Sequence, residues 1–273
     1  MRVSRGMRAL VLFAGPGLLC GALPAPVARA QPAPSQTTPG RATGARAAPA
    51  PAPSPSPSKP VQVARARGVT VERSAAVVRR NRFDPRDPPA SMPPLGPNAD
   101  AVTQSRFGCA ASVQYTVVSR RPEARGRRGV GRGGCTATAR VDSVQVTLDL
   151  DVTIWVPVTA RPKLVDHEEG HRVISERVYD DASTAAALAE AQKLVGRTVT
   201  ARGDTCEAAA DAAVKAANEQ FCQAYLDATS AWATRVGNRY DGITSHGKRS
   251  NPPVDEAIRQ AFEGEPQIQT ARE

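Results

Sequence analysis

Two histidines stand four residues apart in the stretch 166–171, which reads DHEEGH, and a glutamate directly follows the first. Residues four apart lie on the same face of a helix, so the imidazoles of His167 and His171 can bind one metal ion. Glu168 is turned aside from the ion, yet it can reach a water molecule that the ion holds and take its proton. The pattern predicts a catalytic zinc site in which Glu168 is the general base.

A catalytic zinc site needs a third protein ligand. The chain has three histidines in all, and the one outside the motif is His246, in the stretch RYDGITSHG. His246 is therefore our first choice. Asp241 is the alternative, either as a ligand or as a hydrogen-bond partner that orients an imidazole. Glu176 lies nine residues after His167 and faces the opposite side of the helix. Arg177 occupies the place of the third histidine in metzincins, which excludes that class.

Other interpretations of these residues stay open. The motif can belong to a charged surface helix with two solvated histidines. A metal site is favoured, because two of only three histidines in the chain stand at ligand spacing. Asp241 precedes a glycine, and Asp-Gly is a common turn dipeptide. Tyr240 can donate a hydrogen bond to an oxyanion, as a catalytic residue, or be a buried aromatic side chain.

The motif follows a segment with the pattern of a β-sheet. Residues 135–157 alternate, with Val144, Val146, Leu148 and Leu150 on one face, as in a half-buried antiparallel strand. Residues 109–119 are also rich in β-forming side chains, and an Arg/Gly-rich segment joins the two as a hairpin. Residues 68–78 can hold one more strand. These segments predict a hairpin-rich antiparallel sheet.

The pattern then changes to helix. We expect helices at 163–180, which carries the HExxH motif, and at 184–195. A long alanine-rich helix follows at 204–236, with Asp204 or Thr205 as its N-cap. Strands followed by helices predict an α+β domain at residues 69–250, with a zincin-like site.

Four cysteines remain if Cys20 is removed with a leader peptide. Cys206 and Cys222 lie about 24 Å apart on one helix, too far for a disulfide. Cys109 and Cys135 each begin a strand of the hairpin, so they lie at opposite ends of it. Each strand cysteine is therefore predicted to bond to a helix cysteine and staple the long helix to the sheet. Of the two pairings that remain, we favour Cys135–Cys206 and Cys109–Cys222.

The N-terminus has the pattern of an export signal. Three arginines precede an apolar run, and a small-x-small site ends at Ala30, so residues 1–30 are predicted to be a signal peptide cleaved after Ala30. Residues 31–68 are rich in Pro and Ala and are interpreted as a disordered linker. Residues 251–273 are interpreted as a polar tail. A secreted or periplasmic protein with no transmembrane segment after signal removal is expected.

The net charge of +10 does not point to nucleic acid. Residues 1–68 hold nine Lys/Arg and no acid, whereas residues 69–273 hold 27 Lys/Arg and 26 Asp/Glu, so the folded part carries +1. One basic segment remains, with six arginines between Arg120 and Arg132. We interpret it as a solvated loop with at most weak contact to anionic surfaces and no specific nucleic-acid partner.

The HEEGH motif followed by TCEA and then YDGITSHG resembles the bacterial family of predicted secreted zinc-dependent proteases, a domain of unknown function. The similarity runs over about residues 109–247. It implies a zinc metallopeptidase with His167, Glu168 and His171 as its core. It also implies that Tyr240, Asp241, Thr244, His246 and Gly247 form the second motif.

An exported zinc metallohydrolase is therefore expected, with peptides or proteins as substrates. One alternative is a non-catalytic zinc-binding module of the cell envelope, in which Asp241 would be a fourth protein ligand that closes the site. Another is an amidase that cleaves cell-wall peptides with the same residues.

Overall fold

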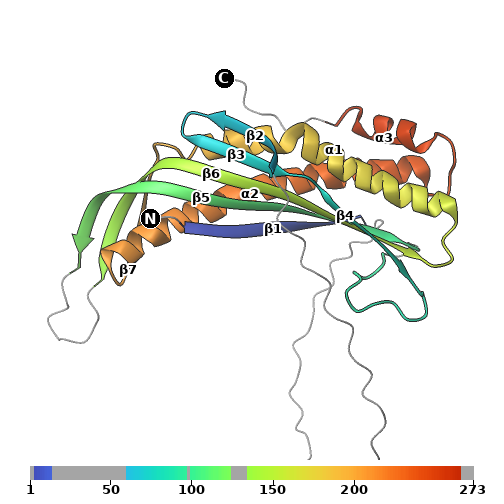
Figure 1. Cartoon of the computed structure of the whole chain (residues 1–273), viewed down its shortest axis with the longest axis horizontal. Helices are drawn as coiled ribbons and strands as arrows, with labels where there is room; N and C mark the ends of the chain where they lie inside the picture. The colour runs from blue at the N-terminus through green and yellow to red at the C-terminus, as the bar shows by residue number, and fades with distance from the viewer. Residues whose placement is uncertain (1–2, 14–59, 97–98, 124–133, 266–273) are drawn as a thin grey trace, which may run out of the picture.

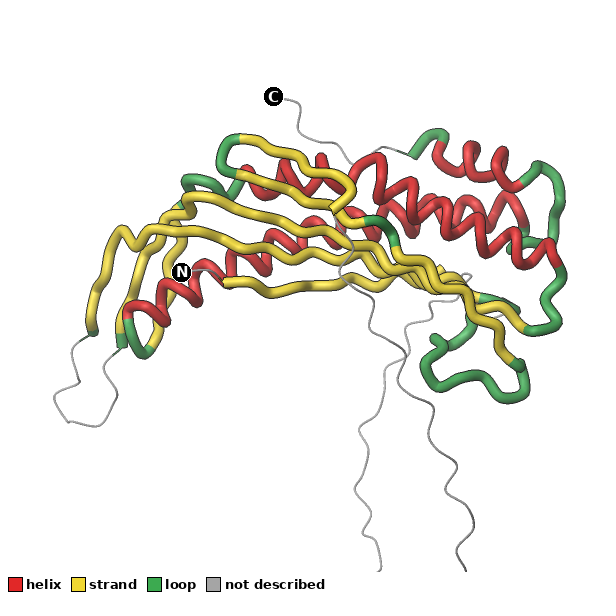
Figure 2. The backbone as a smooth tube through the Cα atoms, in the orientation of Figure 1, coloured by secondary structure: helices red, strands yellow, loops and turns green. Residues whose placement is uncertain are grey.

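The computed structural model describes residues 3–13, 60–96, 99–123 and 134–265. They form an α+β structure with one mixed, largely open sheet and three helices. Figure 1 shows the two long helices side by side along the sheet, and Figure 2 separates the helical and strand layers by colour.

The sheet is built around the predicted hairpin. Strands β5 (Val102–Pro122) and β6 (Cys135–Pro157) pair antiparallel from Pro122 opposite Cys135 to Val102 opposite Trp155. The alternation along β6 is confirmed, because Val144, Val146, Leu148 and Leu150 are buried in the core. The Arg/Gly-rich segment joins the two strands, but residues 124–133 lie outside the described part of the chain.

Five further strands extend the sheet: β1 (Val3–Phe13), β2 (Pro60–Ala66), β3 (Val69–Ser74), β4 (Val77–Phe83) and β7 (Thr198–Gly203). Both β3 and β4 run parallel to β6. The sheet is thus mixed, and the expectation of a purely antiparallel sheet was wrong. The single strand expected at 68–78 is divided between β3 and β4, and β2 lies within the segment interpreted as linker.

The helices are longer than expected. Helix α1 (Pro162–Gln192) is continuous across the gap that we expected between two shorter helices. Helix α2 (Cys206–Thr244) begins at the predicted cap, because the Thr205 hydroxyl accepts a hydrogen bond from the Ala208 amide at 3.1 Å. It continues eight residues beyond the predicted end at 236. Helix α3 (Val254–Phe262) forms within the segment interpreted as a polar tail and buries Ala257, Ile258 and Ala261.

Both predicted disulfides are confirmed. Cys109 in β5 bonds to Cys222 in α2, with 5.6 Å between their Cα atoms. Cys135 at the start of β6 bonds to Cys206 at the start of α2, with 4.9 Å between their Cα atoms. Helix α2 is therefore covalently attached to the sheet at two places.

The first strand coincides with the predicted leader. Residues 3–13 pair with β5 along its outer edge, from Val3 opposite Val113 to Phe13 opposite Thr103. Cleavage after Ala30 stays a prediction, and it would remove this strand from the mature protein. Within the described residues, no helix is both long and apolar enough to cross a membrane.

The two disulfides should contribute strongly to stability, because they close long loops, with sequence separations of 113 and 71 residues. We expect the double variant C109A/C222A to lose about 2–5 kcal/mol of unfolding free energy, measured by denaturant titration. Wild type in a strong reductant is the control, and it should lose more unfolding free energy than C109A/C222A, because both disulfides are then broken. Peptide mapping that links Cys206 to Cys222 would contradict this connectivity.

Candidate metal centre

The HExxH residues lie on α1 where it packs against α2. His167 and His171 are 4 % and 2 % exposed, and Asp241 of α2 is 5 % exposed. Both histidines direct Nε2 at the same carboxylate oxygen, Asp241 Oδ1, at 3.2 Å from His167 and 3.0 Å from His171. The three side chains thus converge on one buried point between the two helices.

This arrangement fits a metal ion. The three ligand atoms of His167, His171 and Asp241 all lie within 4.8 Å of one another. Two imidazoles and one carboxylate are a ligand set found in catalytic zinc sites. The other ring nitrogen of His167, Nδ1, lies 3.3 Å from the Thr244 hydroxyl, which can fix the ring and leave Nε2 for the ion.

Asp241 and His171 shift each other's pKa toward the charged form. Burial alone would raise the pKa of Asp241, but hydrogen bonds to His167 and His171 outweigh burial and lower that pKa well below its usual range. Burial alone would lower the pKa of His171, but the hydrogen bond to Asp241 and its charge outweigh this and raise the pKa. A buried carboxylate of this kind is suited to a cation.

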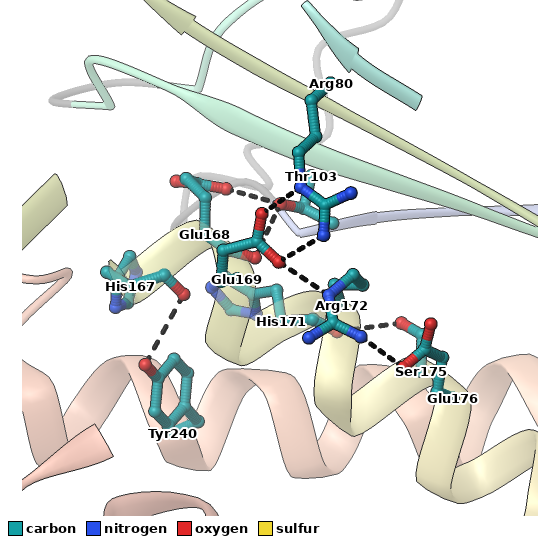
Figure 3. A network of polar contacts seen from close by, with 10 residues as sticks. All are labelled: Arg80, Thr103, His167, Glu168, Glu169, His171, Arg172, Ser175, Glu176 and Tyr240. Carbon is teal, nitrogen blue, oxygen red and sulfur yellow. Dashed lines mark hydrogen bonds and ion pairs between the residues drawn. The ribbon is translucent and has the colours of Figure 1, made fainter. Parts of the chain in front are cut away.

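Glu168 lies beside the ligands and faces the sheet (Figure 3). It is 5 % exposed, and burial raises its pKa against the opposing charge of His171 and a hydrogen bond from Thr103. The Thr103 hydroxyl of β5 lies 2.7 Å from Glu168 Oε2 and 3.1 Å from the Glu168 carbonyl oxygen. Thr103 thus fixes the orientation of the predicted base.

Tyr240 is fully buried behind the histidines. Its ring stacks on His167 at 5.0 Å between centroids and meets the His171 ring edge-on at 5.1 Å. Its hydroxyl donates to the His167 carbonyl oxygen at 3.4 Å (Figure 3). These contacts favour the buried-aromatic interpretation of Tyr240 over a role as oxyanion donor.

His246 lies outside the buried group of three. Helix α2 ends in a left-handed turn at Ser245 and His246, which have φ of 49° and 53°. The turn leaves the His246 side chain 42 % exposed, with Nδ1 3.6 Å from Asp241 Oδ1. Among the described residues, Asp241, our alternative third ligand, joins the two histidines in the buried group, and His246 does not. The alternative interpretation of Asp241-Gly242 as a turn does not hold, because α2 continues to Thr244.

The three ligands and Glu168 line one cavity of about 610 Å³. His246 is at its wall, together with Arg161, Lys163 and Lys248. The cavity gives a small molecule or a peptide access to the buried group. The site is therefore open on one side.

An ion-pair network fixes the opposite side of α1. Arg80 of β4 pairs with Glu169, and Arg172 pairs with both Glu169 and Glu176 (Figure 3). Glu176 therefore faces away from the ligands, as its spacing predicted. The network links β4 to the HExxH helix beside the site.

Sequence reasoning missed Thr103. It lies 65 residues before Glu168, in a strand expected to begin only at 109. Once β5 is extended to Val102, its alternation places Thr103 and Ser105 on the buried face that α1 covers. A buried threonine in an otherwise apolar strand face is the signal that could have identified it.

No protein-family model, curated protein or solved structure matches this chain. The resemblance drawn from the HEEGH and YDGITSHG motifs thus remains an expectation. The chemistry of the site has to be argued from its own residues.

Removal of Asp241 tests the ligand set. We expect the wild type to retain about one zinc per chain after dialysis, and Asp241→Ala to lose it, because three ligands fall to two. His246→Ala is the matched comparison, since it removes a side chain from the same wall without removing a buried ligand. The zinc and iron contents of both variants are measured by elemental analysis. Retention by Asp241→Ala with loss in His246→Ala would contradict the assignment.

Substitution of Gly170 tests the close approach of α1 and α2. A Cβ at this position would lie 2.2 Å from the Tyr240 hydroxyl oxygen, whereas a Cβ at Gly242 of α2 would meet nothing within 4 Å. We expect Gly170→Ala to cost about 1–3 kcal/mol of unfolding free energy by overpacking. Gly242→Ala is the control and should not destabilise, because alanine favours helix. Equal thermal stability of the two variants would argue against the packing described.

Proposed function

We propose that the protein is an exported zinc metallohydrolase that cleaves peptide bonds. The observation that carries the proposal is the convergence of His167, His171 and Asp241 on one buried point in the wall of an open cavity. Glu168 lines the same cavity. The two disulfides are compatible with an oxidising compartment outside the cytoplasm.

In this proposal two histidines and one carboxylate hold the ion, and Thr244 and Tyr240 hold His167 in place. A zinc ion there supplies Lewis acidity, which polarises the scissile carbonyl and makes a water molecule more acidic. Glu168 takes the proton of the attacking water as general base and then gives it to the leaving amine. Burial raises the pKa of Glu168. A raised pKa suits a carboxyl group that has to accept a proton in one step and donate it in the next.

Thr103 supports the base without touching the substrate. Its hydroxyl donates to one oxygen of the Glu168 carboxylate, so it restricts the rotation of the group. A base that is already held in one orientation loses less entropy when the transition state forms. The sheet thus contributes to catalysis in the proposal, through the strand that packs on α1.

A closed structural zinc site is the competing proposal. It would need a fourth protein ligand at the ion. The cavity in front of the three ligands favours the catalytic reading instead, since it leaves room for water and substrate. The resemblance to secreted zinc-dependent proteases points the same way, because it rests on the same HEEGH residues.

Substitution of the base separates catalysis from zinc binding. We expect Glu168→Gln to retain zinc and to lower the hydrolysis of a casein or peptide-library substrate by at least about 100-fold, because general-base catalysis contributes 10²–10⁴-fold. Glu169→Gln is the matched control. That glutamate is the next residue on α1, but it pairs with Arg80 and Arg172 on the other side of the helix. The hydrolysis rate of Glu169→Gln should stay within a few-fold of the wild-type rate.

Three results would count against the proposal. Full activity of Glu168→Gln would remove the base from the mechanism. An equal loss in Glu169→Gln would mean that the helix, and not the base, had been disturbed. A zinc-loaded wild type that hydrolyses no peptide would favour the structural zinc module.

A further inference from the structure

The cavity at the metal centre extends well beyond the ligands. Its lining includes Phe83 at the end of β4 and two residues of the following loop, Pro85 and Leu95. It also includes the basic residues Arg161, Lys163 and Lys248. A bound molecule would therefore meet both apolar groups and cations in this cavity.

A second cavity of about 440 Å³ lies beside the first. The two cavities are neighbours, because Phe83, Pro85 and Leu95 line both of them. All nine residues that line the second cavity are apolar, and five of them are prolines. An apolar pocket next to a cavity with convergent polar groups is typical of a substrate-binding subsite.

The pocket is built on a support of its own. Phe83, Val102 and Trp155 form a small apolar cluster apart from the main core, and Met92 of the loop packs on it. Within the loop, the Asp87 amide donates to the Asp84 carbonyl oxygen at 3.0 Å, and the Met92 amide to the Pro89 carbonyl oxygen at 2.9 Å. Prolines restrict the backbone further. The pocket is therefore largely pre-formed, and filling it costs little ordering entropy.

Leu95 lies at the junction of the two cavities. It is 36 % exposed and lines both cavities, so it offers apolar surface to a bound molecule. An apolar side chain of a bound peptide would cover it and remove both surfaces from water. Leu95 is also exposed enough to be replaced without opening the core.

We propose that the loop of residues 84–96, together with Phe83, is the specificity pocket of this site, and that it takes a large apolar side chain next to the scissile bond. The inference rests on the proposed peptide hydrolysis. It adds the substrate class: peptides with a residue such as leucine or phenylalanine beside the cleaved bond. The residues of the loop that line the second cavity are all apolar, so they suit that side chain.

The test uses the full-length, zinc-loaded protein and two fluorogenic peptides. The two peptides differ at one central position, where one carries Leu and the other Asn. If a peptide library shows cleavage, this position is placed beside the cleaved bond. We expect the wild type to prefer the Leu peptide by about tenfold or more in kcat/KM, since contacts of this size in an apolar pocket give 10–200-fold.

Two variants of Leu95 and one control variant test whether the preference for the Leu peptide depends on the pocket. Leu95→Asn should reduce the preference to about threefold or less, and Leu95→Trp, which fills the pocket, should shift it toward smaller apolar side chains. Val118→Asn is the control, because Val118 is also an exposed apolar residue, at 48 %, but lies in β5 outside both cavities. It should retain the wild-type preference, and all variants should retain zinc.

Binding to zinc-loaded Glu168→Gln separates this inference from the proposed hydrolysis. If the wild type cleaves peptides without an apolar preference, or with one that both Leu95 variants leave unchanged, the pocket assignment is overturned and the hydrolase stands. If the wild type cleaves neither peptide, but Glu168→Gln binds the Leu peptide at least tenfold better and Leu95→Asn abolishes the difference, the pocket stands and hydrolysis falls. Equal binding of both peptides with no cleavage overturns both.

Discussion

One carboxylate oxygen organises the site: Asp241 Oδ1 lies within 3.2 Å of Nε2 of both His167 and His171. Charged groups are costly to bury without partners, and the removal of one partner leaves the others uncompensated. The packing of α1 on α2 therefore has to bring these three side chains together. Gly170 allows that approach, because it leaves space for the Tyr240 ring behind the histidines.

The sheet and the disulfides hold the helices in this position. Helix α2 is bonded to β5 and β6, and the Asn218 side chain donates to the Ala111 carbonyl oxygen at 3.2 Å. Helix α1 is attached to β5 by a hydrogen bond between the hydroxyls of Ser105 and Ser175 at 2.7 Å. Fixed helices keep the candidate ligand atoms within 4.8 Å of one another and Glu168 beside them, which is what a pre-organised site requires.

Local patterns made much of this predictable. Spacing four apart placed His167 and His171 together, and the lengths of a helix and a hairpin eliminated the pairing of Cys109 with Cys135 and of Cys206 with Cys222. The choice between Asp241 and His246 was not predictable, because it depends on where α2 ends, and helix ends are poorly defined by sequence. The role of Thr103 and the parallel pairing of β3 and β4 with β6 were missed because the partners lie far away in the sequence, where periodicity carries no information.

The central claim is that two histidines and Asp241 hold one zinc ion with a position open to solvent. X-ray absorption at the zinc edge of the loaded protein tests it most directly. The account predicts two imidazole nitrogens at about 2.0–2.1 Å, with the carboxylate oxygen and one further light atom at about 2.0–2.2 Å. A third imidazole in the coordination shell, or a shell that lacks imidazole, would contradict it.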